Sequence, residues 1–138
     1  MHALEPFIYR RIAARRNTMP WTYHQADGTL YDPQGNAVAS DAYSGAGAGK
    51  NNTAMEQIAN VGPIPRGSYR IGHSRHSART GPVSMNLTPQ PGTNTFGRSA
   101  FMIHGDNRTH TASHGCIILR RNLREQIDRS DDKELTVQ

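Results

Sequence analysis

The chain has 138 residues, of which 35% are hydrophobic, 13 are glycine and 8 are proline, and its formal net charge is +5. That length suits one domain with a real core and excludes two, and the glycines and prolines argue against long helices. The single cysteine excludes an internal disulfide, and no apolar run approaches the roughly 18 residues of a membrane-spanning helix. The positive charge favours an anionic partner such as nucleic acid, a membrane surface or an anionic wall polymer, although solubility alone also explains it.

Residues 1–18 are predicted to form an N-terminal extension. Residues 4–16 could be a short basic helix with Phe7, Ile8 and Ile12 on one side, or an untethered terminus. The segment has no continuous apolar core followed by a small-residue cleavage site, so we expect no secretory signal. A protein of this kind would be made in the cytoplasm and would need another route to act outside it.

The folded body is predicted to span residues 19–138, and its first part is typical of short strands separated by turns. In WTYHQADGTLYDPQGNAVASDAYSG (21–45), the pair Asp27-Gly28 is a hairpin signal, and residues 33–36 form a second turn. The whole segment therefore predicts a series of short strands rather than a helix.

The segment SGAGAGKNN (44–52) is a glycine-rich loop. It lacks the spacing of a phosphate-binding loop, because Lys50 is followed by Asn51 where such loops have Ser or Thr. We interpret it as a loop that approaches a substrate, with a plain connector as the alternative.

A short helix is predicted over TAMEQIAN (53–60), because Thr53 and Glu56 have the spacing of a capping box. Prolines, alternation or apolar runs then predict strands in four later segments. These segments are 68–71, 82–87, 98–105 and 116–121.

A second helix is predicted near the C-terminus, where Leu119, Leu123 and Ile127 recur every four residues. Asn122 together with Glu125 could cap it. The chain is thus predicted to be mainly β, with two or so short helices.

The stretch HGDNRTHTASHGC (104–116) carries the chemistry that the sequence offers. His104 closes one apolar run and Cys116 opens the next, so the imidazole and the thiol can be adjacent if the two runs pair as strands. A thiol becomes a useful nucleophile beside a base, which predicts His104 as general base and Cys116 as nucleophile. The amides of Gly115 and Cys116 could then stabilise an oxyanion.

Two other interpretations of this stretch stay open. Zinc could be held by four residues of suitable type, although the spacing of the last two is unfavourable and no C-x-x-C or H-E-x-x-H motif accompanies them. The candidate zinc ligands are His104, His110, His114 and Cys116. The cysteine could also be an inert core residue, since free cysteines are often simply buried.

Four segments in order resemble those of a known family. SHGC (113–116) after IHG resembles the active-site signature of L,D-transpeptidase (YkuD-like) catalytic domains, and GPIPRGSYRI is similar to their strand-leading TPxGxYxI. With the W-x-Y…G-x-L and YSG-x-G…NN segments, the layout resembles even more the compact L,D-transpeptidase-like effectors delivered by type VI secretion. The resemblance covers residues 19–127 and implies a YkuD-like β-sandwich or barrel.

The resemblance also implies roles for the residues of the signature. Cys116 would be the nucleophile and His104 its base, oriented by the carbonyl of Gly105. His114 and Gly115 would line the oxyanion region with Cys116, and Ser113 would make local hydrogen bonds. His110 matches nothing in the signature and is expected to be a solvated loop residue. Two departures are a short spacer of eight residues before SHGC, and Ile118 where the wider family has asparagine.

Substrate contacts are expected from Tyr43, Ser44 and Lys50, whose loop carries part of the resemblance, and from Arg98, which could face the cleft. The basic segment GHSRHSARTG (72–81) could bind a carboxylate of a peptide stem through its arginines. Because basic surface loops are usually solvated, we prefer to interpret this segment as a solvated loop.

The function implied is a cysteine L,D-carboxypeptidase or L,D-transpeptidase that needs no cofactor. It would cleave the terminal D-Ala from peptidoglycan tetrapeptide stems, or exchange it for another D-amino acid, as a type VI secreted antibacterial toxin in the periplasm of a target bacterium. Its partners would be those stems, the delivery components and a cognate immunity protein, with no nucleic acid and no transmembrane segment. The alternatives are a zinc-binding basic module that binds nucleic acid without catalysis, and an inert wall-binding domain.

Overall fold

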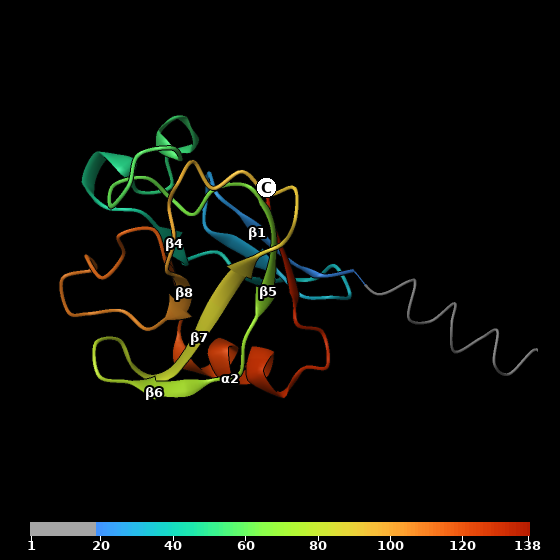
Figure 1. Cartoon of the computed structure of the whole chain (residues 1–138). Helices are drawn as coiled ribbons and strands as arrows, with labels where there is room; N and C mark the ends of the chain where they lie inside the picture. Colours follow the sequence, from blue (N-terminus) through green and yellow to red (C-terminus); the bar gives the residue numbers. More distant parts are fainter. Residues whose placement is uncertain (1–18) are drawn as a thin grey trace, which may run out of the picture.

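The structure is a computed structural model that describes residues 19–138 (Figure 1). The helix predicted over residues 4–16 lies outside the described residues, and the boundaries of the predicted domain stay a prediction. In the described part, no helix has the length and apolar character needed to cross a membrane.

The segment 21–45 forms short strands separated by turns, as predicted. At the first turn, Gly28 N–H donates to the carbonyl oxygen of His24 at 2.9 Å. At the second, Gly35 N–H donates to the carbonyl oxygen of Asp32 at 2.9 Å. The strands are β1 (Trp21–His24), β2 (Thr29–Tyr31), β3 (Ala37–Ala39) and β4 (Tyr43–Ser44).

The rest of the described chain adds six strands, one α-helix and two 3₁₀ turns. The strands are β5 (Gly67–Ile71), β6 (Arg75–Ser77), β7 (Gly81–Pro89), β8 (Phe101–His104), β9 (Ile117–Ile118) and β10 (Glu134–Val137). The helical elements are η1 (Gly47–Gly49), η2 (Thr53–Met55) and α2 (Arg121–Arg129).

The ten strands form one mixed sheet in the order β3-β2-β1-β10-β5-β7-β8-β9-β4, with β6 paired to β7 beside this path. Two pairs are parallel, β1 with β10 and β8 with β9, and the remaining pairs are antiparallel. The prediction of a mainly β protein is confirmed. The pair β8–β9 joins the two apolar runs that the sequence places on either side of the stretch 104–116.

The core is a single cluster of buried side chains from most strands and from α2. Leu119, Leu123 and Ile127 belong to it: Leu123 and Ile127 lie on the inward face of α2, as their spacing predicted, and Leu119 lies just before the helix. In Figure 1, α2 lies beneath β7 and β5, and it contacts β7. The helix thereby closes the core on the side where β6 and the start of β7 lie.

The helix predicted over 53–60 does not form, and the second predicted helix differs from the prediction at its start. The segment 53–60 forms a 3₁₀ turn over Thr53–Met55, capped by the side chain of Asn52, which accepts from Ala54 N–H at 3.1 Å. The predicted capping box is wrong because Glu56 bonds elsewhere. In α2 the N-cap residue is Arg120 without a side-chain cap, so Asn122 lies inside the helix rather than at its cap.

Two strands were not predicted. The segment 72–81, interpreted as a solvated loop, forms β6 and its turn into β7. The C-terminal β10 lies in the middle of the sheet, parallel to β1 and antiparallel to β5. Strand β10 pairs with strands distant in sequence, and β6 pairs with β7 through a bulged register. No local pattern therefore indicates either strand.

Glu56 is buried at the centre of a polar network that joins β1 to the GPIP segment. It accepts hydrogen bonds from Gln25 Nε2 at 2.9 Å and from Arg66 Nη2 at 2.7 Å and backbone N–H at 3.0 Å. Burial acts to raise the pKa of Glu56, but these donors outweigh it and lower the pKa to about 2. The carboxylate is therefore held in its charged form in the folded protein.

We expect Glu56→Gln to lower the free energy of unfolding at pH 7 by roughly 2 kcal/mol, the size of lost charge-assisted hydrogen bonds. The folded pKa lies below the usual 4.5, so this stabilisation is complete above pH 4.5 and is lost as the pH falls towards 2. Urea unfolding at several pH values measures the difference. Glu125→Gln is the control, because that carboxylate forms an exposed pair with Arg121 at 3.4 Å. A constant difference down to pH 2 would contradict the assignment.

Candidate active site

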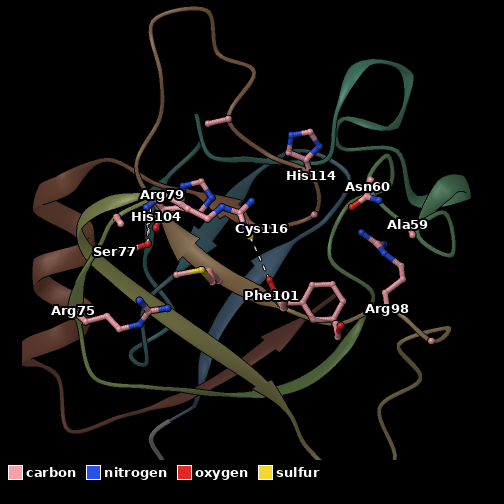
Figure 2. Close-up of a pocket in the computed structure, with 18 residues that line it drawn as sticks. Ala59, Asn60, Arg75, Ser77, Arg79, Arg98, Phe101, His104, His114 and Cys116 are labelled. Atoms are coloured by element: carbon pink, nitrogen blue, oxygen red, sulfur yellow. Dashed lines mark hydrogen bonds between the residues drawn. The ribbon is translucent and has the colours of Figure 1, made fainter.

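His104 and Cys116 are brought together by the parallel pair β8–β9. His104 is the last residue of β8, and Cys116 directly precedes β9. The register pairs Ile103 with Ile117 and His104 with Ile118. Both side chains line one cavity of about 640 Å³. Figure 2 shows them in that cavity together with Arg79.

His104 is buried, with 4% of its surface exposed. Its Nδ1 lies 2.8 Å from the carbonyl oxygen of Gly105, which can only accept, so Nδ1 carries the proton and Nε2 is the basic atom of the neutral ring. Burial lowers the pKa of His104, and the nearby Arg124 adds to this, while the Gly105 carbonyl opposes it. The ring is thus held neutral, which is the form that a general base requires.

Cys116 is partly buried, and its thiol donates a long hydrogen bond of 3.8 Å to the carbonyl oxygen of Ala100. Burial raises the pKa of the Cys116 thiol, against the opposing effects of the Met102 backbone N–H, Arg79 and Arg98. The resting pair is therefore a neutral thiol and a neutral imidazole. A thiolate forms when a base takes the proton, and His104 is the neutral imidazole in the same cavity.

The turn before Cys116 is built on the buried hydroxyl of Ser113. Its Oγ donates to the carbonyl oxygen of Cys116 at 2.6 Å, and accepts from Gly45 N–H at 2.9 Å and Gly115 N–H at 3.1 Å. Because the Gly115 amide is already bonded, its predicted use in an oxyanion site needs correction. The amides of His114 and Cys116 remain as candidates for that use, and the exposed His114 ring lies at the cavity wall (Figure 2).

Ser44 is fully buried and ties three segments of the chain to one another. Its Oγ donates to the carbonyl oxygen of Gly115 at 3.2 Å and accepts from Ile64 N–H at 2.8 Å. The YSG loop, the GPIP segment and the SHGC turn therefore meet at one hydroxyl. The expected substrate contact of Ser44 is not seen, because a fully buried side chain supports the turn instead.

Tyr43 holds the loop between His104 and Ser113. Its hydroxyl donates to Asp106 Oδ1 at 2.5 Å and accepts from Ala112 N–H at 3.0 Å. Burial, with the Asp106 bond, raises the pKa of Tyr43 to about 12. Lys50 Nζ lies 4.1 Å from the centre of the Tyr43 ring. Neither Tyr43 nor Lys50 lines the cavity, so their predicted substrate contacts stay predictions without support from the cavity.

Asp106 was not singled out in the sequence, yet it organises this loop. Besides Tyr43 it contacts His110, whose Nδ1 lies 2.7 Å from Asp106 Oδ2. Burial acts to raise the pKa of Asp106, but the His110 and Tyr43 bonds outweigh it, so the net shift is downward. His110 is exposed, as expected, but it is paired with this carboxylate rather than simply solvated.

Arg98 lines the cavity, but its guanidinium is turned into the protein rather than towards a substrate. It donates to the carbonyl oxygens of Gly62 at 3.0 Å and Pro63 at 2.7 Å, and also to that of Glu56. Its Cζ lies 5.5 Å from the centre of the Phe101 ring. The predicted substrate contact is thereby corrected: Arg98 fastens the 56–63 segment to the wall of the cavity.

Gly115 has φ of +129° and lies against Arg98, whose Nη2 would overlap with a Cβ at this position. The guanidinium cannot withdraw without leaving three carbonyls unpaired. We expect Gly115→Ala to lower the free energy of unfolding by about 1–3 kcal/mol and to displace Cys116, with loss of activity. Thermal unfolding and iodoacetamide labelling of the thiol measure the two effects.

Gly92→Ala is the matched control for this prediction. Gly92 also has a positive φ, +91°, but nothing lies within 4 Å of a Cβ there. It therefore carries the backbone strain without the overlap. If the two variants have equal stability and equal thiol labelling, the contact with Arg98 is not what requires glycine at position 115.

The segment that forms β6 and the following turn contributes to the cavity. Arg75 and Arg79, together with Ser77 and Thr80, are among the residues that line it. Both arginines are exposed, in agreement with the preferred interpretation of a solvated segment, and they also border the cavity. The feature of the sequence that indicates this placement is the pair of arginines spaced four apart in a basic segment, which can bind a carboxylate.

The zinc interpretation is not supported by the geometry. Within residues 19–138, no group of three or more His, Cys, Asp or Glu side chains is placed to hold a metal ion. His110 is paired with Asp106 and does not line the cavity, whereas His104 and Cys116 do. The four candidate ligands are thus not gathered into one set.

A comparison with protein families gives one match. The model of a family described as the Tlde1 domain matches residues 39–136, which contain β4, both 3₁₀ turns, the SHGC turn and α2. The W-x-Y segment of β1 lies before the matched residues. No curated protein and no solved structure matches the chain.

Proposed function

The chain belongs to the Tlde1 domain family, whose members are L,D-transpeptidase-like effectors of type VI secretion, and on this basis we propose that it is a cysteine L,D-carboxypeptidase that also exchanges D-amino acids. The substrate would be the tetrapeptide stem of peptidoglycan. One observation carries the proposal: the only thiol of the chain and a buried neutral imidazole line the same cavity.

In the first step, His104 Nε2 takes the proton of the Cys116 thiol as sulfur attacks the carbonyl carbon of the third stem residue. A carbon–sulfur bond forms, and the oxygen becomes an oxyanion near the amides of the SHGC turn. The amide bond to the terminal D-Ala then breaks, and the imidazolium returns its proton to the leaving amine. The products are free D-Ala and a thioester on Cys116.

In the second step, the thioester is resolved by water or by the amine of a D-amino acid. Water yields a tripeptide stem, and the amine yields a stem with an exchanged fourth residue. His104 acts as base again, since it must deprotonate whichever nucleophile attacks. Both outcomes share the same acyl-enzyme and the same residues, which is why we propose both activities for one site.

The biological setting follows from the family. A type VI effector is delivered into a neighbouring bacterium, and we propose that this one acts on the cell wall from the periplasm. Trimming or exchange would remove the donor stems that the target needs for cross-linking. A producer of such a toxin would need a cognate immunity protein, and the open cavity around Cys116 is the natural place for that protein to block.

The test is digestion of purified muropeptides with and without an added D-amino acid, followed by mass spectrometry. We expect tetrapeptide stems to become tripeptides, and to gain the added residue when it is present. Equal amounts of product from the wild-type protein and from Cys116→Ala, or none from either, would contradict the proposal. Stoichiometric zinc in the active protein would instead favour the metal-binding interpretation.

A further inference from the structure

The cavity around Cys116 is lined by positive side chains without a carboxylate. Among the described residues that line it, three are arginine, two are histidine and none is Asp or Glu. Two of the arginines are bound to the protein: Arg98 to backbone carbonyls, and Arg75 through Nη2 to Asn86 Oδ1 at 3.1 Å. Within residues 19–138, the guanidinium of Arg79 has no such partner, so it is available to an anionic ligand.

The backbone that carries Arg79 is held in a fixed turn. Ser77 Oγ accepts hydrogen bonds from the backbone N–H groups of Arg79 and Thr80, both at 3.2 Å. The hydroxyl of Thr80 lies 2.7 Å from that of Ser84, across the turn into β7. Such side-chain hydrogen bonds to backbone and across a turn restrict its conformation.

This turn is also anchored to the rest of the site. The buried Arg124 of α2 donates to the carbonyl oxygens of Pro82 at 2.7 Å and Val83 at 3.1 Å, and to that of Leu119 at 2.8 Å. One side chain therefore connects the start of β7 to the end of the segment that carries Cys116. These contacts hold the backbone that carries Arg79 in place relative to the segment of Cys116, and the Arg79 side chain extends from it as an exposed group.

Arg79 lies near the reacting sulfur. Its charge is one of the influences that act to lower the pKa of Cys116, and Figure 2 shows Arg79 in the same part of the cavity as His104 and Cys116. An arginine presents a planar fork of donors that matches the two oxygens of a carboxylate. The ligand that this position fits is a carboxylate bound close to the scissile bond.

We propose that Arg79 binds the α-carboxylate of the D-amino acid that leaves from, or enters, the acyl group on Cys116. This inference rests on the proposed function. The carboxyl carbon of the leaving residue is three bonds from the scissile carbonyl carbon, within about 4 Å of it. A cation beside the sulfur is thus beside that carboxylate when the sulfur attacks.

The proposal has consequences for specificity. A stem that ends one residue after the scissile bond places its free carboxylate at Arg79, whereas a longer or cross-linked stem places a neutral amide there. An amide offers one oxygen without charge, so the fork loses its bidentate partner. In exchange, the incoming D-amino acid must occupy the same position as the leaving D-Ala, because the two steps are the reverse of each other. Arg79 then selects D-amino acids over simple amines.

The test compares two synthetic tetrapeptide stems, one with a C-terminal carboxylate and one with a carboxamide. We expect the wild-type protein to prefer the carboxylate, and Arg79→Gln to lose about 10- to 100-fold in kcat/KM on it, the effect of losing a hydrogen bond to a charged group. On the carboxamide the same variant should have nearly the kcat/KM of the wild-type protein, so the preference for the carboxylate stem is lost. Arg79→Lys should keep part of it, since the charge remains but the fork is lost.

Arg70→Gln is the matched control, an exposed arginine on β5 that does not line the cavity. If Arg79→Gln slows both stems equally, Arg79 acts on the thiol or the fold, and its assignment to the carboxylate is overturned. If the wild-type protein converts neither stem, the proposed function itself fails. The two failures are thereby distinguished by the wild-type measurement alone.

Discussion

Cys116→Ala is expected to reduce the conversion of tetrapeptide stems to the background rate, a loss of more than about 10⁴-fold, as for other covalent nucleophiles. The chain has no second cysteine that could replace it. The measurement is the rate of tripeptide formation from purified tetrapeptide muropeptides. Intact-mass analysis of the wild-type protein during turnover should show an acyl adduct that the variant lacks.

The fold should survive this substitution. The thiol makes one long hydrogen bond of 3.8 Å to Ala100, whereas the turn is held by Ser113 and Ser44. Thermal unfolding of Cys116→Ala should therefore be close to that of the wild-type protein. A folded variant that still produces tripeptides would overturn the assignment of the nucleophile.

His104→Gln is expected to lower kcat by about 10²–10⁴-fold, the usual contribution of a general base. Burial holds the thiol pKa above its ordinary value, so without a base the thiolate is scarce at pH 7. The imidazole Nδ1 is engaged by the Gly105 carbonyl at 2.8 Å, which leaves Nε2 to take the proton. Single-turnover rates of acyl-enzyme formation measure this step directly.

The pH profile gives a second measurement of the same base. Burial lowers the pKa of His104 below 6.5, so the neutral form persists as the pH falls through that value. The acid limb of kcat/KM should therefore have an apparent pKa below 6.5, and His104→Gln should lack this limb. An acid limb centred above pH 7, or one that survives in the variant, would contradict the role of His104.

His110→Gln is the matched control for the base. It lies in the same thirteen-residue stretch, but it is exposed, paired with Asp106 and absent from the cavity wall. We expect its kcat and pH profile to remain those of the wild-type protein. This contrast separates a specific role of His104 from a general effect of losing an imidazole in this loop.

Local patterns predicted much of the fold because short strands and tight turns are specified by neighbouring residues. The hairpin at Asp27-Gly28 and the inward face of α2 are examples, since each depends on residues within one or two turns of the chain. The predicted helix caps are wrong because capping depends on which side chains are free to bond the first N–H groups. Glu56, the expected cap partner, is used by Gln25 and Arg66 from other segments.

The sequence by itself determined the residue types at the site. A lone thiol, a histidine closing an apolar run and the SHGC signature are visible as residues and spacings, so the sequence alone indicates the two residues that we propose as nucleophile and base. It also indicated one domain of mainly β structure, because alternation and frequent Gly and Pro are local properties of the chain.

Only the tertiary structure decided what the arginines and hydroxyls do. Arg98 and Arg124 are indistinguishable from surface charges in the sequence, yet each is buried and donates to backbone carbonyls. Ser44 supports the turn before Cys116. Arg79 lies at the cavity because β6 pairs with β7, and no local pattern of residues indicates that pairing. The physical reason is that a long polar side chain is placed by the partners that folding leaves unsatisfied, and those partners come from distant segments.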